Sequence, residues 1–211
     1  MNIIADTIKK GRKFDQVIEG ARAIFMRDGF EGANVDDIAK AAGVSKATLY
    51  SYFPDKRVLF AEVARQECER QAESTINVVD MANDPREALT HIARAMVEFV
   101  TSDFGINVFR ICVAESARFP ELGCQFYDSG PRLVRERVSE FLRCAAEQGH
   151  FVIDDMELAA EQLMELTKTY IFPRILCGIQ TKFSDAEKAR IVDGAVEMFM
   201  ARYGTGSTAR A

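Results

Sequence analysis

The sequence predicts an all-α protein of nine or ten helices, in which three short N-terminal helices precede a larger helical domain. Hydrophobic residues recur at spacings of three and four along most of the chain, as they do on the buried face of an amphipathic helix. Glycine and proline fall between these periodic segments, and the alternation typical of strands is scarce. Hydrophobic residues make up 48% of the 211 residues, which is enough for a substantial core and argues against disorder.

The first three predicted helices cover residues 12–28, 35–42 and 46–53. The first carries an apolar face and ends at Gly29, because glycine readily adopts the left-handed conformation that closes a helix. The third is followed by Pro54, and a proline disfavours helical geometry at the residue before it. The three segments are therefore expected to be separate helices.

The rest of the chain is predicted to form longer helices. Segments 84–87 and 184–187 each have an N-cap residue followed three positions later by a glutamate, which is typical of a helix start. The small residues of segment 204–211 are expected to form a disordered tail. The predicted helices cover residues 55–81, 85–102, 107–118, 120–129, 131–149, 155–178 and 185–203.

Charge is distributed unevenly along the chain, whose net charge is −5. Residues 1–57 hold 10 Lys and Arg against 8 Asp and Glu, a net +2, whereas residues 58–211 hold 17 against 24, a net −7. A basic run, formed by Lys9, Lys10, Arg12 and Lys13, precedes the first helix. A basic arm on a slightly positive N-terminal part is compatible with nucleic-acid binding at one end of the molecule.

Several classes of protein are disfavoured. No apolar stretch approaches the roughly 20 residues of a membrane span, and the N-terminus is too charged for a secretory signal, so we expect a cytoplasmic protein without a membrane partner. Five scattered cysteines and two histidines, without a Cys-x-x-Cys pair, indicate reduced thiols and no metal or cofactor, although redox sensing by one thiol stays an alternative. No catalytic motif is found, so an enzyme is not expected.

The segment 35–53 has the residue types that two short helices crossing at a steep angle require. Ala39 is small where the helices approach, and Gly43 suits a turn that needs a positive φ. Asn34 and Ser45 stand where N-caps are expected. The shared apolar core is supplied by Ile38, Ala42, Val44 and Leu49. The segment therefore predicts a helix-turn-helix.

The second helix of this pair has a polar or small face. Lys46, Ala47, Tyr50 and Ser51 fall within one arc of roughly 140° on a helical wheel, opposite the side that carries Leu49. Such a face fits the major groove of DNA. An ordinary corner between two helices with a solvated face is the alternative.

The same stretch resembles the TetR/AcrR family of repressors, whose run has the approximate form I-A-x-x-A-G-V-S-x-x-x-L-Y-x-[HY]-F-x-x-K-x-x-L. The resemblance extends without a gap over about residues 14–60. It departs from the family where Ala33 and Asn34 replace a frequent threonine, although Asn34 still suits an N-cap. The matching positions are Ile38, Ala39, Ala42, Gly43, Val44, Ser45, Leu49, Tyr50, Tyr52, Phe53, Lys56 and Leu59.

The resemblance implies roles for particular residues. Lys46, Ala47 and Tyr50 are expected to contact base edges or thymine methyl groups. Phosphate contacts are expected from Asn34, Ser45, Thr48, Tyr52 and Lys56. Other roles stay open, because Tyr52 also suits a core position, Ser45 a cap and Ser51 a solvated site.

The resemblance also implies two domains and a mode of action. Residues 1–56 would form the DNA-binding domain, with 1–11 as a flexible arm, and residues 57–203 would form a dimerisation and effector-binding domain. The stretch 109–127 resembles the C-terminal domain of an AefR-like subgroup. The expected function is that of a repressor that binds a near-palindromic operator in double-stranded DNA as a homodimer and is released by a small-molecule effector.

The C-terminal domain offers candidates for both of its expected roles. The candidate effector pocket is apolar and consists of Phe99, Phe104, Phe109, Cys112, Phe119, Phe126, Tyr127, Met164 and Phe172. The candidate dimer interface consists of Ala159, Leu163, Leu166, Tyr170, Ile191, Ala195, Met198 and Phe199. Each of these residues also suits an ordinary core. The effector is unidentified, and an activator or a helical interaction module would share many of the same features.

Overall fold

The computed structural model describes residues 11–79, 84–117 and 120–206. Within these ranges the regular elements are helices, and the only pairing of extended backbone is an isolated antiparallel bridge between Phe151 and Gly204. The all-α prediction is confirmed. Most of the predicted basic arm and the last five residues of the predicted tail lie outside the described ranges.

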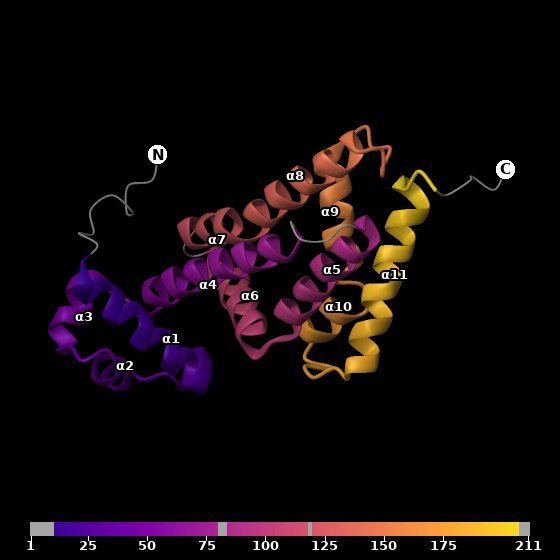
Figure 1. Cartoon of the computed structure of the whole chain (residues 1–211). Helices are drawn as coiled ribbons and strands as arrows, with labels where there is room; N and C mark the ends of the chain where they lie inside the picture. Colours follow the sequence, from indigo (N-terminus) through magenta and orange to yellow (C-terminus); the bar gives the residue numbers. More distant parts are fainter. Residues whose placement is uncertain (1–10, 80–83, 118–119, 207–211) are drawn as a thin grey trace. The chain divides into compact units, whose positions relative to one another are not determined.

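The chain divides into two compact units (Figure 1). The head unit comprises residues 1–67 and 107–126, and the body unit comprises residues 68–106 and 127–211. The functional boundary expected after residue 56 stays a prediction.

The head unit contains three complete helices, the first part of a long fourth helix, and segments of two later helices. Their bounds are α1 (Arg12–Gly32), α2 (Val35–Ala41), α3 (Lys46–Tyr52) and α4 (Lys56–Val79), joined by parts of α6 (Asp103–Ser116) and α7 (Pro120–Tyr127). Its core is rich in phenyl rings: those of Phe14 and Phe53 have centroids 5.4 Å apart, and those of Phe25 and Phe60 meet edge to face at 5.0 Å. Burying such rings is a strong source of stability for a small unit.

Three glycines shape the helix-turn-helix. Gly29 has φ +70° and breaks the helical geometry of α1 at the position where the sequence predicted its end. Gly43 has φ +64° in the turn between α2 and α3, as predicted. A Cβ atom on Gly20 would lie 2.6–2.8 Å from the backbone and Cβ of Ala42, so only a glycine lets α1 approach the end of α2 so closely.

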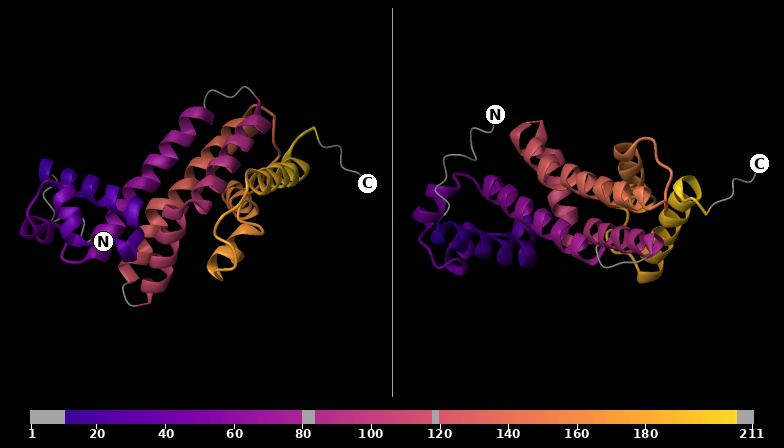
Figure 2. Two further views of the ribbon diagram at one scale, coloured as in Figure 1. Left: turned by 90° about the horizontal axis from the view of Figure 1, so that it is seen from below. Right: turned by 45° about the horizontal axis from the view of Figure 1, so that its top comes forward.

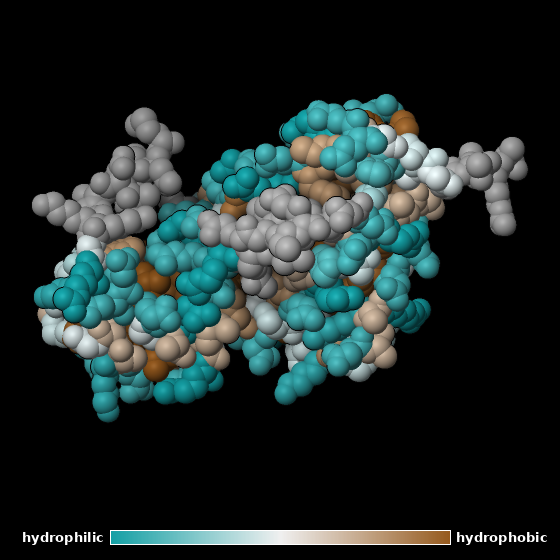
Figure 3. All heavy atoms as spheres, viewed as in Figure 1, coloured by the Kyte–Doolittle hydropathy of each residue, from teal (hydrophilic) through white to brown (hydrophobic). Residues whose placement is uncertain are grey.

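The body unit is built from α5 (Pro85–Thr101), α8 (Leu133–Glu147), α9 (Met156–Leu166), α10 (Ile171–Leu176) and α11 (Asp185–Tyr203). Helix α11 runs beside α5, and α8 packs on α9 (Figures 1 and 2). The buried faces are lined by aliphatic residues, among them Leu89, Leu142 and Leu163. On the face drawn in Figure 3, hydrophobic residues form separate areas among hydrophilic ones.

The predicted helix over residues 155–178 is interrupted, and this prediction is corrected. Helix α9 ends at Leu166 and α10 begins at Ile171, because Tyr170 adopts φ +70°, which no α-helix tolerates. The guanidinium of Arg174 lies 3.6 Å from the centre of the Tyr170 ring and donates to the Tyr170 carbonyl oxygen at 3.0 Å. These contacts hold the turn in its unusual conformation.

The predicted break before Pro131 is also corrected. Residues 128–132 form a π-helical turn, η1, that joins α7 to α8 without a gap. Proline has no amide hydrogen, and a wider turn accommodates the carbonyl that would otherwise have been its partner.

Part of the predicted disordered tail is ordered. The amide of Val152 donates to the carbonyl of Tyr203, and the amide of Thr205 donates to the carbonyl of His150. Gly204 and Thr205 therefore pair with the connection between α8 and α9, and the expected disorder does not apply to these two residues.

We predict that Gly20→Ala lowers the free energy of unfolding by about 1–2 kcal/mol, because the new methyl group meets the Ala42 backbone. Gly194→Ala is the matched control, since a Cβ there has nothing within 4 Å on helix α11. This second change should stabilise by about 0.5–1 kcal/mol through helix propensity. Chemical denaturation followed by circular dichroism measures both, and equal effects of the two changes would contradict the close approach.

Candidate nucleic-acid interface

Helix α3 presents the face that the helical wheel predicts. Lys46, Ala47 and Tyr50 are exposed, with 44% of the Tyr50 surface accessible. On the opposite side Leu49 is only 1% accessible. A seven-residue helix is not stable alone, so this burial is what holds α3 in place and leaves its outer face available.

Both predicted N-caps are formed. The side-chain oxygen of Asn34 accepts from the amide of Asp36 at 2.9 Å, and the hydroxyl of Ser45 accepts from the amide of Thr48 at 3.1 Å. The hydroxyls of Ser45 and Thr48 also lie 2.9 Å apart. Asn34 and Ser45 remain exposed, so their polar atoms lie at the N-termini of α2 and α3, where the helix dipole favours an anion such as phosphate.

Tyr52 is divided between core and surface. Its ring meets that of Phe14 edge to face with centroids 5.9 Å apart, and the residue is half-buried. The sequence left open whether Tyr52 belongs to the core, and the ring contact shows that part of it does.

Lys56 joins the start of α4 to the connection between α1 and α2. Its ammonium donates to the carbonyl oxygens of Phe30 at 2.8 Å and Ala33 at 3.1 Å, and lies 4.5 Å from the centre of the Phe30 ring. A second tie in the same unit runs from the Arg22 guanidinium to the Glu67 carboxylate at 2.7 Å. Sequence reasoning missed both structural contacts, because they join residues that are distant along the chain.

Lys46 forms an ion pair across the helix-turn-helix. Its ammonium lies 2.9 Å from one carboxylate oxygen of Asp36 and 3.1 Å from the other. The hydrogen bond that the Lys46 ammonium donates to the Asp36 carboxylate raises the pKa of Lys46, and the negative charge of Asp36 adds to the effect. The ammonium is therefore charged and oriented before any partner arrives.

Two family models cover most of the chain. Residues 17–63 match the model for bacterial regulatory proteins of the tetR family, and residues 87–205 match that for the C-terminal domain of AefR-like transcriptional repressors. The chain belongs to the TetR family. TetR-family proteins regulate transcription by binding DNA, so this member is a DNA-binding regulator and not an enzyme.

Individual relatives agree with the family. The transcriptional repressor AcnR of Corynebacterium efficiens is 32% identical over 83 residues, which make up 39% of each protein. The match thus spans about two fifths of that relative's length. Among solved structures, a TetR-family transcriptional regulator from Mesorhizobium loti has a TM-score of 0.80 and 27% identity over 93% of this chain and 99% of its own. The flavonoid-responsive regulator FrrA has a TM-score of 0.64 and 32% identity, over 93% and 100% respectively.

The residues predicted for an effector pocket differ in burial and in unit. Phe104, Cys112 and Met164 are buried, and burial raises the pKa of the Cys112 thiol to about 12. Phe109 and Phe126 belong to the head unit and meet edge to face at 6.2 Å. The remaining described candidates belong to the body unit. Phe99 and Phe172 are half-buried, and Tyr127 is exposed. Phe119 lies outside the described residues. A common pocket stays a prediction.

The raised pKa of Cys112 bears on the redox alternative. A thiol with a pKa of about 12 is protonated near neutral pH and is a poor nucleophile. Cys112 is therefore a structural residue in this conformation. The exposed cysteines are Cys124, Cys144 and Cys177.

The residues predicted for the dimer interface differ in how exposed they are, and their role in an interface stays a prediction. Four of them are almost fully buried inside the single chain and face its own core: Ala159, Leu163, Ala195 and Phe199. Met198 is 62% accessible and Tyr170 38% accessible, whereas Leu166 and Ile191 are half-buried. The sequence did not distinguish the residues that face the core from those on the neighbouring face of the same helix, because both faces carry apolar residues.

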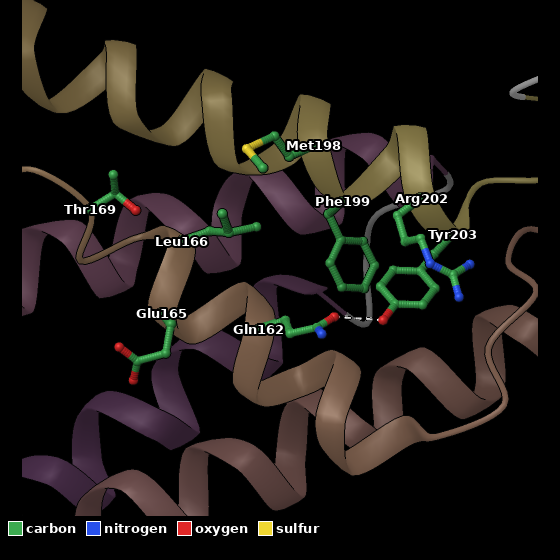
Figure 4. A pocket seen from close by; sticks show the side chains of 8 residues that line it. All are labelled: Gln162, Glu165, Leu166, Thr169, Met198, Phe199, Arg202 and Tyr203. Carbon is green, nitrogen blue, oxygen red and sulfur yellow. Dashed lines mark hydrogen bonds between the residues drawn. The ribbon is translucent and has the colours of Figure 1, made fainter. Parts of the chain in front are cut away.

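A shallow groove of about 380 Å³ runs between α9 and α11 (Figure 4). Its lining is apolar around Leu166 and Met198 and becomes polar where the Tyr203 hydroxyl donates to Gln162 at 2.6 Å. The other lining residues are Glu165, Thr169, Phe199 and Arg202.

Membrane and metal functions gain no support in the part of the chain that the structure describes. None of its helices combines the length and apolarity that crossing a bilayer requires. The same residues contain no group of three or more His, Cys, Asp or Glu side chains placed to hold a metal ion.

We predict that Lys56→Ala lowers the free energy of unfolding by about 1–3 kcal/mol, because the carbonyls of Phe30 and Ala33 lose a charged donor. Lys13→Ala, at an exposed position near the start of α1, is the control and should stay within about 0.5 kcal/mol of the parent. Urea titration followed by circular dichroism measures both changes. A Lys56→Ala protein as stable as the control would rule out this structural role.

Proposed function

We propose that this TetR-family regulator is a repressor that binds a near-palindromic operator as a homodimer and leaves it when a small apolar ligand binds. The observation that carries the proposal is the face of α3, on which Lys46, Ala47 and Tyr50 are exposed above the buried Leu49. A rigid helix with a small and polar outer face matches the width of the major groove. The match to AefR-like repressors favours repression over activation.

Base and phosphate contacts are proposed for different residues. Lys46, Ala47 and Tyr50 would meet base edges, because they share the outer face of α3. The residues proposed for phosphate contacts are Asn34, Ser45, Thr48, Tyr52 and Lys56. The Lys56 ammonium has one N–H beyond the two that its carbonyl partners take. If that N–H meets a phosphate, Lys56→Ala should also reduce the salt dependence of binding by about one unit of slope.

A homodimer is proposed because one short recognition helix reads too few bases for useful specificity. Two such helices, roughly 34–36 Å apart, would meet successive major grooves of an inverted repeat. The proposed contact surface lies on α9 and α11 around the groove that Leu166 and Met198 line. Exposed apolar side chains at this place favour association over solvation.

An effector would act by shifting populations. A ligand that binds better to a conformer with separated recognition helices lowers the population of the conformer that binds DNA. The shift in this equilibrium is limited by the ratio of the ligand's affinities for the two conformers. FrrA is described as flavonoid-responsive, and its structure covers nearly the whole of this chain at 32% identity. Flavonoids are therefore the first class of compound to test, in keeping with the apolar and aromatic candidates for the pocket.

We expect the purified protein to select an inverted repeat from a pool of random duplexes. The two half-sites should be about 10 base pairs apart from centre to centre. Tyr50→Ala should change the preferred half-site, because Tyr50 lies on the outer face of α3, whereas Met26→Ala, at an exposed position of α1, should not. Sequencing of the bound fragments measures both. A protein that enriches no sequence at low ionic strength would refute the proposed function.

We expect Met198→Asp to shift the protein towards the monomer and to weaken operator binding at least tenfold, because a charge replaces an apolar side chain that is 62% accessible. Val113→Asp changes an equally apolar residue, 54% accessible, on α6 and serves as the control. Sedimentation velocity at micromolar concentration gives the mass. The proposed interface is wrong if Met198→Asp remains a dimer or if Val113→Asp dissociates to the same extent.

A further inference from the structure

The ion pair between Lys46 and Asp36 stands at the part of the head unit that would face DNA. The ammonium lies within 3.1 Å of both carboxylate oxygens, and the two side chains are 51% and 63% accessible. A pair as exposed as this contributes little to folding, typically up to about 1 kcal/mol. The main effect of this ion pair is therefore on the charge and the orientation of the Lys46 side chain.

The positions of the two residues explain why they pair. Lys46 is the first residue of α3, where the positive end of the helix dipole disfavours an ammonium. Asp36 lies in the first turn of α2, where the same kind of dipole favours a carboxylate. Pairing offsets the unfavourable placement of Lys46 and restricts a side chain that otherwise has four free rotations. The ammonium is thereby presented from one place at the edge of the α3 face.

The carboxylate has a second effect when DNA approaches. Phosphates surround the major groove, and an isolated lysine at the end of a recognition helix pairs with them regardless of sequence. A carboxylate beside that lysine repels phosphates. It therefore raises the free energy of complexes in which the ammonium contacts a phosphate and not a hydrogen-bond acceptor of a base.

We propose that Asp36 is a specificity-determining residue, which positions the Lys46 ammonium for base acceptors and disfavours its capture by the DNA backbone. This inference rests on the proposed function, because it assumes that α3 enters the major groove. Asp36 acts through Lys46 and need not touch a base itself.

The test compares Asp36→Asn with Asp37→Asn. The two acids are neighbours in the first turn of α2, both are exposed, and each change removes one negative charge, but only Asp36 forms the pair with Lys46. Affinities are measured for an operator selected by the parent protein and for a scrambled duplex of the same composition. We expect Asp36→Asn to lower the ratio of the two affinities roughly three- to tenfold, mainly by tighter binding to the scrambled duplex. Asp37→Asn should change the ratio less than about twofold.

Two further variants separate positioning from general charge. Asp36→Glu keeps the carboxylate and should recover most of the ratio. In a Lys46→Met background, Asp36→Asn should have no more effect on the ratio than Asp37→Asn, because the ammonium is no longer present. Thermal melting of each variant ensures that folded proteins are compared.

The outcomes distinguish this inference from the proposed function. Equal effects of Asp36→Asn and Asp37→Asn, or an effect of Asp36→Asn that persists without Lys46, would overturn the role of Asp36 while leaving operator binding intact. A parent protein that binds neither duplex would overturn the proposed function itself.

Discussion

The presentation of α3 depends on how closely α1 approaches the helix-turn-helix. Helices α2 and α3 have seven residues each, too few to be stable alone. Helix α2 packs on α1, and α3 packs on α2 and on the Phe14 ring of α1. That packing needs a glycine at position 20, because any side chain there would meet the backbone of Ala42. With the approach secured, Leu49 and Phe53 are buried and the opposite face of α3 is left exposed. The exposure of this face of α3 thus depends on the close approach of α1 to the end of α2.

Polar groups in the head unit serve the fold before they serve a partner. Asn34 and Ser45 cap α2 and α3, and Lys56 satisfies two carbonyls at the end of α1. Lys46 is engaged by Asp36. The same groups that could contact a phosphate or a base are already oriented in the free protein, so less ordering is needed when DNA binds. Pre-organisation of this kind reduces the entropic cost of association.

Helix α4 contributes residues to both units: its first part belongs to the head unit and the rest to the body unit. Within the head unit its start is fixed by Lys56, and one further tie joins Glu67 on α4 to Arg22 on α1. A movement of this part of α4 would therefore be carried to α1 and to the helix-turn-helix that packs on it. In the body unit, Leu158 on α9 and Met198 on α11 are exposed, whereas Ala159 and Ala195 on the same two helices are buried, so each helix has a solvent-facing side as well as a core-facing side.

The sequence by itself determined the fold class, most helices, the two N-caps, the turn at Gly43 and the exposed face of α3. These features are local: they depend on hydrophobic periodicity, on caps and on glycine conformation, all of which act over a few residues. Only the tertiary structure decided that Tyr170 interrupts a helix, that a π-turn carries the chain past Pro131, and which of the apolar residues of α9 and α11 face the core. It also decided the partners of Lys46 and Lys56. Contacts of this kind join residues 10 to 26 positions apart, and which of them form depends on how the helices pack.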